Sequence, residues 1–249
     1  MTTPIDDVLD DLVAEYDRLE SILSGLTDDQ WRSESGAPGW SVTDVMIHLA
    51  QTEEAVVATT SRPNEPNRLS REGVTLDEWV DQQVASERDE PEVVFDRWKA
   101  ARRASVDALR AAEPDAKFSW AHTPLKPRTL ATTRLAEHWA HALDVTVPFD
   151  IPLPDTDRLR HIAWLGHSTL PYGFAFNGQE AHELFAQLTA PDGVTIWRFG
   201  RSDADSTITG SAGAFCRVGA QRLSPEASGL VTTGPHGVAA LRVLRNYAG

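Results

Sequence analysis

The spacing of apolar residues over the first 150 positions limits most strongly how this chain can fold. These residues recur at steps of three and four, the period of one helix face, over four stretches: 4–25, 41–56, 75–112 and 127–145. The third stretch is expected to break near Pro91, because proline interrupts a helix. Ser41 with Asp44 has the spacing of a helix-capping pair. Four such helices with short or polar connections predict an antiparallel four-helix bundle.

The residues after position 150 follow a different pattern. Short β-branched or aromatic runs bounded by Gly and Pro predict strands at 195–199, 206–210 and 229–233, the first two of them paired. Helices are expected at 155–168, 211–223 and 237–246. The proline-rich stretch Pro148–Pro154 is typical of a linker. The sequence therefore predicts an α+β chain with a helical bundle at 1–150 and a small α/β domain at 151–249.

The net charge of the chain excludes some classes of binding partner. The formal net charge is −14, from 23 basic and 37 acidic side chains, and residues 151–249 hold eight of each, so the acidic excess lies in 1–150. Nucleic acids and anionic membranes are themselves negative, so neither is an expected partner. No apolar run approaches a membrane span, and the acidic start does not resemble a signal peptide, so we expect a cytoplasmic protein. The apolar content does not decide its oligomeric state.

Three side chains are candidate metal ligands. Glu137 and His141 lie four apart on a predicted helix, so they project from one face and could hold one cation. Asp144 could accept the second N–H of the His141 imidazole, the usual support for a metal-bound histidine. His48 lies among apolar residues on another predicted helix and is expected to face the interior, where it needs a polar partner. Two imidazoles and one carboxylate would leave open positions on a divalent ion.

Other reactive residues have plainer interpretations. Cys216 is the single cysteine, which excludes a disulfide or a multi-cysteine zinc site, and its apolar neighbours predict a buried structural thiol. Glu53 and Glu54 are expected on a solvated face, and the alternative is that one of them reaches the rim of the metal pocket. His138 points about 100° round the helix from Glu137, which favours a structural role. The chain has no glycine-rich nucleotide-binding motif.

The residues around the candidate ligands form longer motifs. They are Gly39-Trp40-Ser41 with Asp44 and His48-Leu49-Ala50, then Arg134-Leu135-Ala136-Glu137 with Trp139-Ala140-His141 and Asp144-Val145. These motifs resemble the mycothiol-dependent maleylpyruvate isomerase family, whose N-terminal part is a DinB-like four-helix metal-binding bundle. Three later motifs resemble the C-terminal domain of one branch of that family, which is similar to sterol-carrier-protein folds: Ile196–Gly200, Ile208–Ala212 and Tyr247-Ala248-Gly249.

The resemblance implies roles for single residues. The family's zinc-ligand positions fall on His48, Glu137 and His141. An arginine of its C-terminal domain contributes to activity, and the match places it at Arg222. A helix-end cation that interacts with the carbonyl dipole is the alternative interpretation of Arg222.

Trp40 and Trp139 neighbour the ligands in the sequence and are expected to line the metal pocket. The implied cofactors are zinc or another divalent metal, with mycothiol as a thiol cosubstrate. The implied partners are this thiol and a small electrophilic substrate that carries a carboxylate. Metal-bound thiol loses its proton and becomes a nucleophile. This chemistry fits an isomerase or an S-transferase. The residues also allow a DinB-like hydrolase or lyase that acts without thiol, and a non-catalytic metal-binding module.

Overall fold

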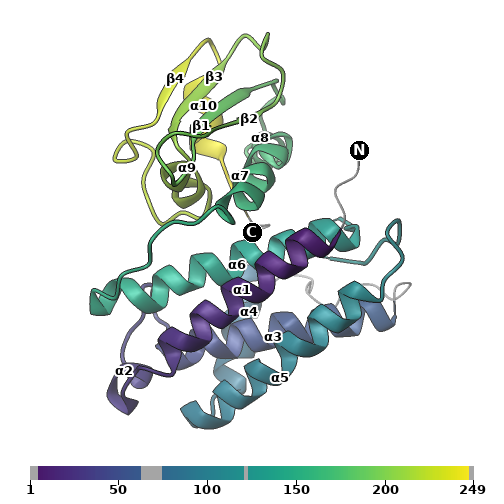
Figure 1. Ribbon diagram of the computed structural model, residues 1–249, viewed down its shortest axis with the longest axis vertical. Helices are drawn as coiled ribbons and strands as arrows, with labels where there is room; N and C mark the ends of the chain where they lie inside the picture. The colour runs from purple at the N-terminus through teal and green to yellow at the C-terminus, as the bar shows by residue number, and fades with distance from the viewer. Residues whose placement is uncertain (1–4, 63–74, 121–122, 247–249) are drawn as a thin grey trace. The chain divides into compact units, whose positions relative to one another are not determined.

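A computed structural model describes residues 5–62, 75–120 and 123–246 (Figure 1). The chain divides into two compact units with the boundary between Leu153 and Pro154. We call the described residues before this boundary unit 1 and those after it unit 2. Unit 1 is built from helices and unit 2 contains a four-stranded sheet with helices, which confirms the predicted α+β class. The Tyr247-Ala248-Gly249 motif lies outside the described residues.

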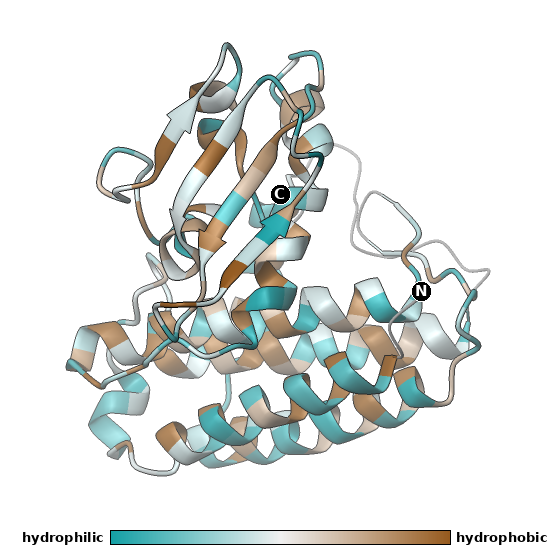
Figure 2. Cartoon of the chain, turned by 45° about the horizontal axis from the view of Figure 1, so that its top comes forward, coloured by the Kyte–Doolittle hydropathy of each residue, from teal (hydrophilic) through white to brown (hydrophobic). Residues whose placement is uncertain are grey.

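Unit 1 contains four long helices that pack on one another (Figure 1). Its elements are α1 (Ile5–Leu23), α2 (Asp28–Arg32), α3 (Val42–Ser61), α4 (Leu76–Ser86), α5 (Pro91–Arg110), α6 (Pro127–Thr146) and the 3₁₀ turn η1 (Val147–Phe149). Helix α3 packs on α5 and α6, and α1 packs on the same two helices. Apolar stripes run along them, with hydrophilic residues on other faces (Figure 2). The break expected near Pro91 is present, because α5 begins at that residue.

The start of α3 is fixed by the expected capping pair. The Ser41 hydroxyl accepts a hydrogen bond from the Asp44 N–H at 3.1 Å, and the Asp44 carboxylate accepts one from the Ser41 N–H at 2.9 Å. The Arg88 Nε donates to the other Asp44 oxygen at 2.7 Å. These bonds satisfy backbone donors that a helix start leaves free. They thereby fix the first turn of α3, and His48 lies one turn further along the same helix.

Unit 2 is a small sheet with helices. Its elements are α7 (Leu159–Ser168), α8 (Leu170–Phe176), β1 (Phe185–Thr189), β2 (Ile196–Phe199), β3 (Thr207–Ser211), α9 (Ala212–Gly219), β4 (Val231–Thr233) and α10 (Gly237–Val243). The strand order is β2-β1-β3-β4, with β1 parallel to β3 and the other two pairs antiparallel. Among the described helices, none is long and apolar enough to cross a membrane.

The sheet corrects one prediction. We expected β2 and β3 to pair, but β1 lies between them and pairs with both. Its sequence Phe-Ala-Gln-Leu-Thr buries only Ala186 and Leu188 fully, and its core side chains include no β-branched residue. The run is therefore too short and too mixed to stand out as a strand. The helix expected over 211–223 also ends early, at Gly219, and Gln221 follows with a left-handed φ of 57°.

Candidate metal centre

His48 of α3 meets Glu137 and His141 of α6 inside unit 1. The Nε2 atoms of both histidines face the same carboxylate oxygen, Glu137 Oε2, at 3.7 Å from His48 and 3.6 Å from His141. One ligand atom from each residue lies within 4.8 Å of the other two. The imidazole rings meet edge to face, with centroids 5.1 Å apart. The structure thus brings together the three side chains that the sequence nominated from two separate segments.

The donor set fits a divalent ion. Zinc bonds of about 2.0–2.2 Å at tetrahedral angles would place ligand atoms roughly 3.3–3.5 Å apart. The two nitrogen-to-oxygen distances at Glu137 exceed this range by only a few tenths of an ångström. Two imidazole nitrogens and one carboxylate oxygen are a usual ligand set for a catalytic zinc with a further open position. His48, Glu137 and His141 would hold such an ion.

Asp144 contacts the ring nitrogen of His141 that does not face Glu137. Its Oδ2 atom lies 2.9 Å from the His141 Nδ1 atom, and both side chains are buried. Burial lowers the pKa of His141, but the bonds to Asp144 and Glu137 outweigh it and raise that pKa to about 9. Because Nδ1 donates its proton to Asp144, the Nε2 atom is the one turned toward Glu137. The carboxylate therefore sets which nitrogen can bind a metal.

The pKa shifts of the other two ligands favour the protonation states that bind a metal. Burial lowers the pKa of His48, so its imidazole favours the neutral form that binds metals. Burial alone would raise the pKa of Glu137, yet the bonds to His141 and His48 hold that pKa well below its usual range. Glu137 therefore carries its negative charge at neutral pH.

The two tryptophans expected at the pocket differ in what surrounds them. The centroid of the Trp40 ring lies 5.2 Å from that of the His48 ring. It lies 6.2 Å from the centroid of the His141 ring, and these two rings are nearly parallel. The Trp40 Nε1 donates to Asp81 of α4 at 2.9 Å, which holds the indole in place. Trp139 is buried on α6 beside the ligands in sequence. A role for either ring in binding a cosubstrate stays a prediction.

Glu53 was expected on a solvated face, and this expectation is wrong. Its side chain on α3 is fully buried, because α3 is covered by both α5 and α6. Glu54, its neighbour, is 45% exposed and pairs with Arg97 at 2.7 Å. The one signal in the sequence is that Glu53 follows the inward-facing His48 on the same helix, and this signal does not distinguish Glu53 from Glu54. His138 is fully buried and bonded to Trp98, as expected of a structural residue.

Two residues of unit 2 were singled out. Cys216 is fully buried, its Sγ lies 3.7 Å from the Leu159 carbonyl oxygen, and burial strongly raises its pKa, so the predicted structural thiol is confirmed. Arg222 follows α9, and its Nη1 donates to the Ala220 carbonyl at 2.8 Å near the helix end. This contact matches the helix-end alternative, and a catalytic role for Arg222 stays a prediction.

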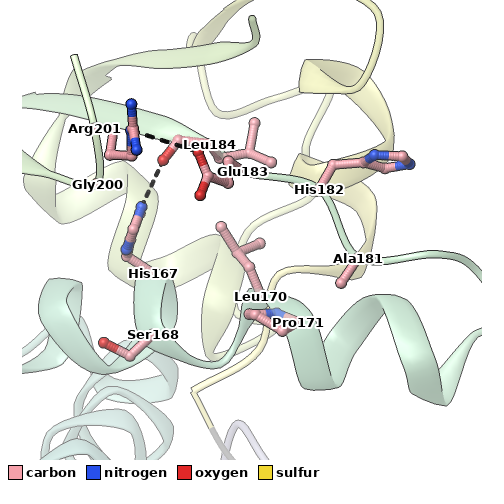
Figure 3. Close-up of a pocket in the computed structure, with 10 residues that line it drawn as sticks. All are labelled: His167, Ser168, Leu170, Pro171, Ala181, His182, Glu183, Leu184, Gly200 and Arg201. Atoms are coloured by element: carbon pink, nitrogen blue, oxygen red, sulfur yellow. Dashed lines mark hydrogen bonds and ion pairs between the residues drawn. The ribbon is translucent and has the colours of Figure 1, made fainter. Parts of the chain in front are cut away.

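A hollow of about 510 Å³ lies within unit 2, between the α7–α8 junction and the chain segments around β1 and β2 (Figure 3). His167 contacts the Leu184 carbonyl oxygen there at 2.8 Å, and Arg201 lies 3.7 Å from Glu183. These polar side chains of the hollow are therefore bonded within the chain. Its lining includes none of the three candidate ligands.

Comparisons with known proteins bear on the same residues. The family model of the mycothiol maleylpyruvate isomerase N-terminal domain matches residues 12–146. The uncharacterized protein Rv0036c of Mycobacterium tuberculosis is 34% identical over 217 residues, which cover 85% of this chain and 84% of that protein. The uncharacterized protein MT0041, from another strain of that species, matches to the same extent.

Two solved structures share the fold. They are the mycothiol-dependent maleylpyruvate isomerase and a histidine-to-alanine mutant of it, each with a TM-score of 0.61 and 18% identity. Each match covers 94% of this chain and 96% of the solved one. The likeness therefore extends through both units.

Proposed function

Because the chain belongs to the family of the mycothiol maleylpyruvate isomerase N-terminal domain, we propose that it is a metal-dependent enzyme that uses mycothiol as a nucleophile. The observation that carries this proposal is the meeting of His48, Glu137 and His141 within the matched residues 12–146. The solved structures that share the fold are of an isomerase that depends on mycothiol, which supports this choice of thiol.

In this proposal unit 1 is a DinB-like antiparallel four-helix bundle that holds zinc or another divalent metal. When bound, such an ion lowers the pKa of a coordinated thiol, so that the sulfur is a thiolate at neutral pH. The chain's own residues prepare the site for it. Asp144 orients the His141 imidazole, and Trp40 covers one side of both histidines with its indole anchored on Asp81.

The proposed reaction acts on a double bond conjugated to a carbonyl group in a small, carboxylate-bearing substrate. The thiolate adds to one carbon, a C–S bond forms, and the electron pair moves to the carbonyl oxygen as an enolate. Rotation about the former double bond and loss of the thiolate give the isomer, whereas protonation of the enolate would keep the thioether, as in an S-transferase. Arg222 is proposed as the cation that stabilises the enolate, and Trp139 together with Trp40 is proposed to contact the thiol. We further propose a cytoplasmic enzyme whose partners are small molecules, not nucleic acid.

The test compares H48A and H141A with the wild type, and uses H182A as a control because His182 belongs to unit 2. Bound zinc is measured after dialysis, and maleylpyruvate isomerisation is followed with and without mycothiol. Both ligand variants should lose the metal and the thiol-dependent rate, and H182A should keep both. Full activity in a metal-free protein would contradict the proposal. Metal-dependent turnover without thiol would instead support a hydrolase or lyase, and bound metal without turnover a binding module.

A further inference from the structure

The loop that precedes α3 contacts α6 through Gly36. The Gly36 N–H donates a hydrogen bond to the Asp144 carbonyl oxygen at 2.7 Å. In a helix this oxygen would accept from the residue four positions on, but that residue is Pro148, which has no N–H. The loop therefore supplies the donor that the end of α6 lacks, at the residue whose carboxylate contacts His141.

The close approach at Gly36 leaves no room for a side chain. A Cβ atom on residue 36 would lie 2.9 Å from the Asp144 Cα and 3.2 Å from the Asp144 Oδ1. Carbon atoms in ordinary contact lie about 3.5–4.0 Å apart. A larger residue would thus push the loop and α6 apart by several tenths of an ångström. Because α6 packs on α1, α3 and α5, we expect the loop to move and the helix to stay.

Hydrogen bonds within the loop connect Gly36 to Trp40. The N–H and the hydroxyl of Ser35, a buried residue, both donate to the Trp40 carbonyl oxygen at 2.8 Å. The Trp40 N–H donates to the Ala37 carbonyl oxygen at 3.1 Å. These bonds close residues 35–40 into one unit. A displacement of the loop at Gly36 is therefore passed on to the backbone of Trp40.

The half-buried Trp40 ring contacts two of the candidate ligands. Its centroid lies 5.2 Å from that of His48 and 6.2 Å from that of His141, nearly parallel to the latter. The bond to Asp81 holds the indole nitrogen, whereas the loop holds the backbone of Trp40. Apolar groups around a metal site control how easily solvent reaches the ion. The position of the loop thus bears on access to the candidate metal centre.

We propose that Gly36 is a positioning residue, whose contact with Asp144 sets where the Trp40 ring lies over His48 and His141. The inference rests on the proposed function, because it concerns the same ligands. With a larger residue at position 36 the loop lifts from α6 and carries the Trp40 ring away from the two imidazoles. Water and a competing chelator then reach a bound ion more easily.

The first measurement is the fluorine NMR spectrum of the full-length, metal-free protein labelled with fluorotryptophan, in which W40F identifies the Trp40 signal. G36A should shift this signal, because the Trp40 ring moves relative to the two imidazole rings. G25A is the matched control, since Gly25 also lies in unit 1 and a Cβ there would only make an ordinary contact, 3.4 Å from the Ile22 carbonyl oxygen. G25A should leave the Trp40 signal in place. An unshifted Trp40 signal in G36A would overturn the inference.

The second measurement is the rate at which the zinc-loaded protein releases its metal to an excess of a chromophoric chelator. G36A and W40A should each release zinc about tenfold faster than the wild type, whereas G25A should not. The double variant G36A/W40A should be no faster than W40A, because both substitutions act through the same ring. Wild-type release in G36A, or effects that multiply in the double variant, would overturn the inference.

Thermal unfolding of the metal-free variants checks that each is folded. If G36A does not fold, S35A decides, because the Ser35 hydroxyl ties the loop to Trp40 from within. An unshifted Trp40 signal in S35A then contradicts the inference. H48A is measured alongside. Zinc binding as tight as in the wild type in H48A refutes the proposed function, whereas loss of zinc there together with wild-type release in G36A refutes this inference alone.

Discussion

Replacing Asp44 with alanine should lower the free energy of unfolding of unit 1, although Asp44 is not one of the candidate metal ligands. The side chain of Asp44 is 5% exposed and accepts hydrogen bonds from the Ser41 N–H, the Ser41 hydroxyl and the guanidinium of Arg88. Alanine removes all of them and leaves the Ser41 N–H at the start of α3 without its acceptor. The first turn of α3, which precedes His48, then loses the hydrogen bonds that fix it.

The size of the effect follows from two contributions. The capping bonds account for about 0.5–2 kcal/mol. The ion pair adds roughly 0.5–1 kcal/mol, because the Arg88 side chain is 58% exposed and solvent screens its charge. D44A should therefore lower the free energy of unfolding of unit 1 by about 1–3 kcal/mol, and R88A by no more than about 1 kcal/mol. D44N keeps one capping acceptor and should fall between them.

The same contacts predict a pH dependence. Burial raises the pKa of Asp44, but the bonds from Arg88 and Ser41 outweigh it and hold that pKa below its ordinary value. A depressed folded-state pKa contributes stability above the unfolded value of about 3.9, and this stability is lost as the pH falls through the folded value. The stability difference between wild type and D44N should thus shrink below about pH 4.

Urea unfolding of chelator-treated protein measures these differences without a metal contribution. Tryptophan fluorescence reports mainly on unit 1, since only Trp164 and Trp197 lie beyond Leu153. The unit 1 transition is fitted by itself because two units need not unfold together. A loss below about 0.5 kcal/mol in D44A, or equal losses in D44A and R88A, would refute the capping argument. A D44N difference that is unchanged at pH 3 would refute the pKa argument.

Three further substitutions or modifications test other parts of the structure. Trp98→Phe removes the donor to the buried His138 Nε2 and should cost about 1–3 kcal/mol in urea unfolding; stability equal to wild type would show that this bond is dispensable. Cys216 should resist a disulfide-exchange reagent in the folded protein and react once in urea, and rapid labelling of the folded protein would contradict its burial. Gly200→Ala should destabilise unit 2 by more than about 1 kcal/mol, because Gly200 has a φ of 82° and a Cβ there would overlap the Leu184 carbonyl oxygen; an unchanged Trp197 fluorescence transition would contradict this.

The sequence predicted the helices of unit 1 better than the sheet of unit 2, and the reason is physical. Each long helix repeats its apolar period over several turns, as in α1, where Leu9, Leu12, Leu19 and Leu23 are buried. Strand β1 has five residues, and its two pairing partners come from later in the chain. Pairing between strands depends on contacts that a local pattern does not contain, so β2 and β3 were wrongly paired with each other.

The same contrast explains which parts of the candidate site could be predicted. His48, Glu137 and His141 were found because their spacing and their resemblance to known motifs are visible in single segments. Glu53 was missed because its burial depends on α5 and α6 both covering α3, which no local pattern records. Adjacent glutamates on a helix point about 100° apart, so one can be exposed and the next buried.

The acidic excess of residues 1–150 can now be divided by location. Many of its carboxylates are exposed, as at Glu54, and contribute only to a screened overall field. Glu137 is one of the candidate ligands, Asp144 bonds to His141, and Glu53 is fully buried on α3. A divalent ion at the candidate ligands would meet the negative charge of Glu137, whose pKa is held low by its bonds to His141 and His48. It follows that affinity for the ion should depend on the carboxylates at the ligands, and hardly on the net charge of −14.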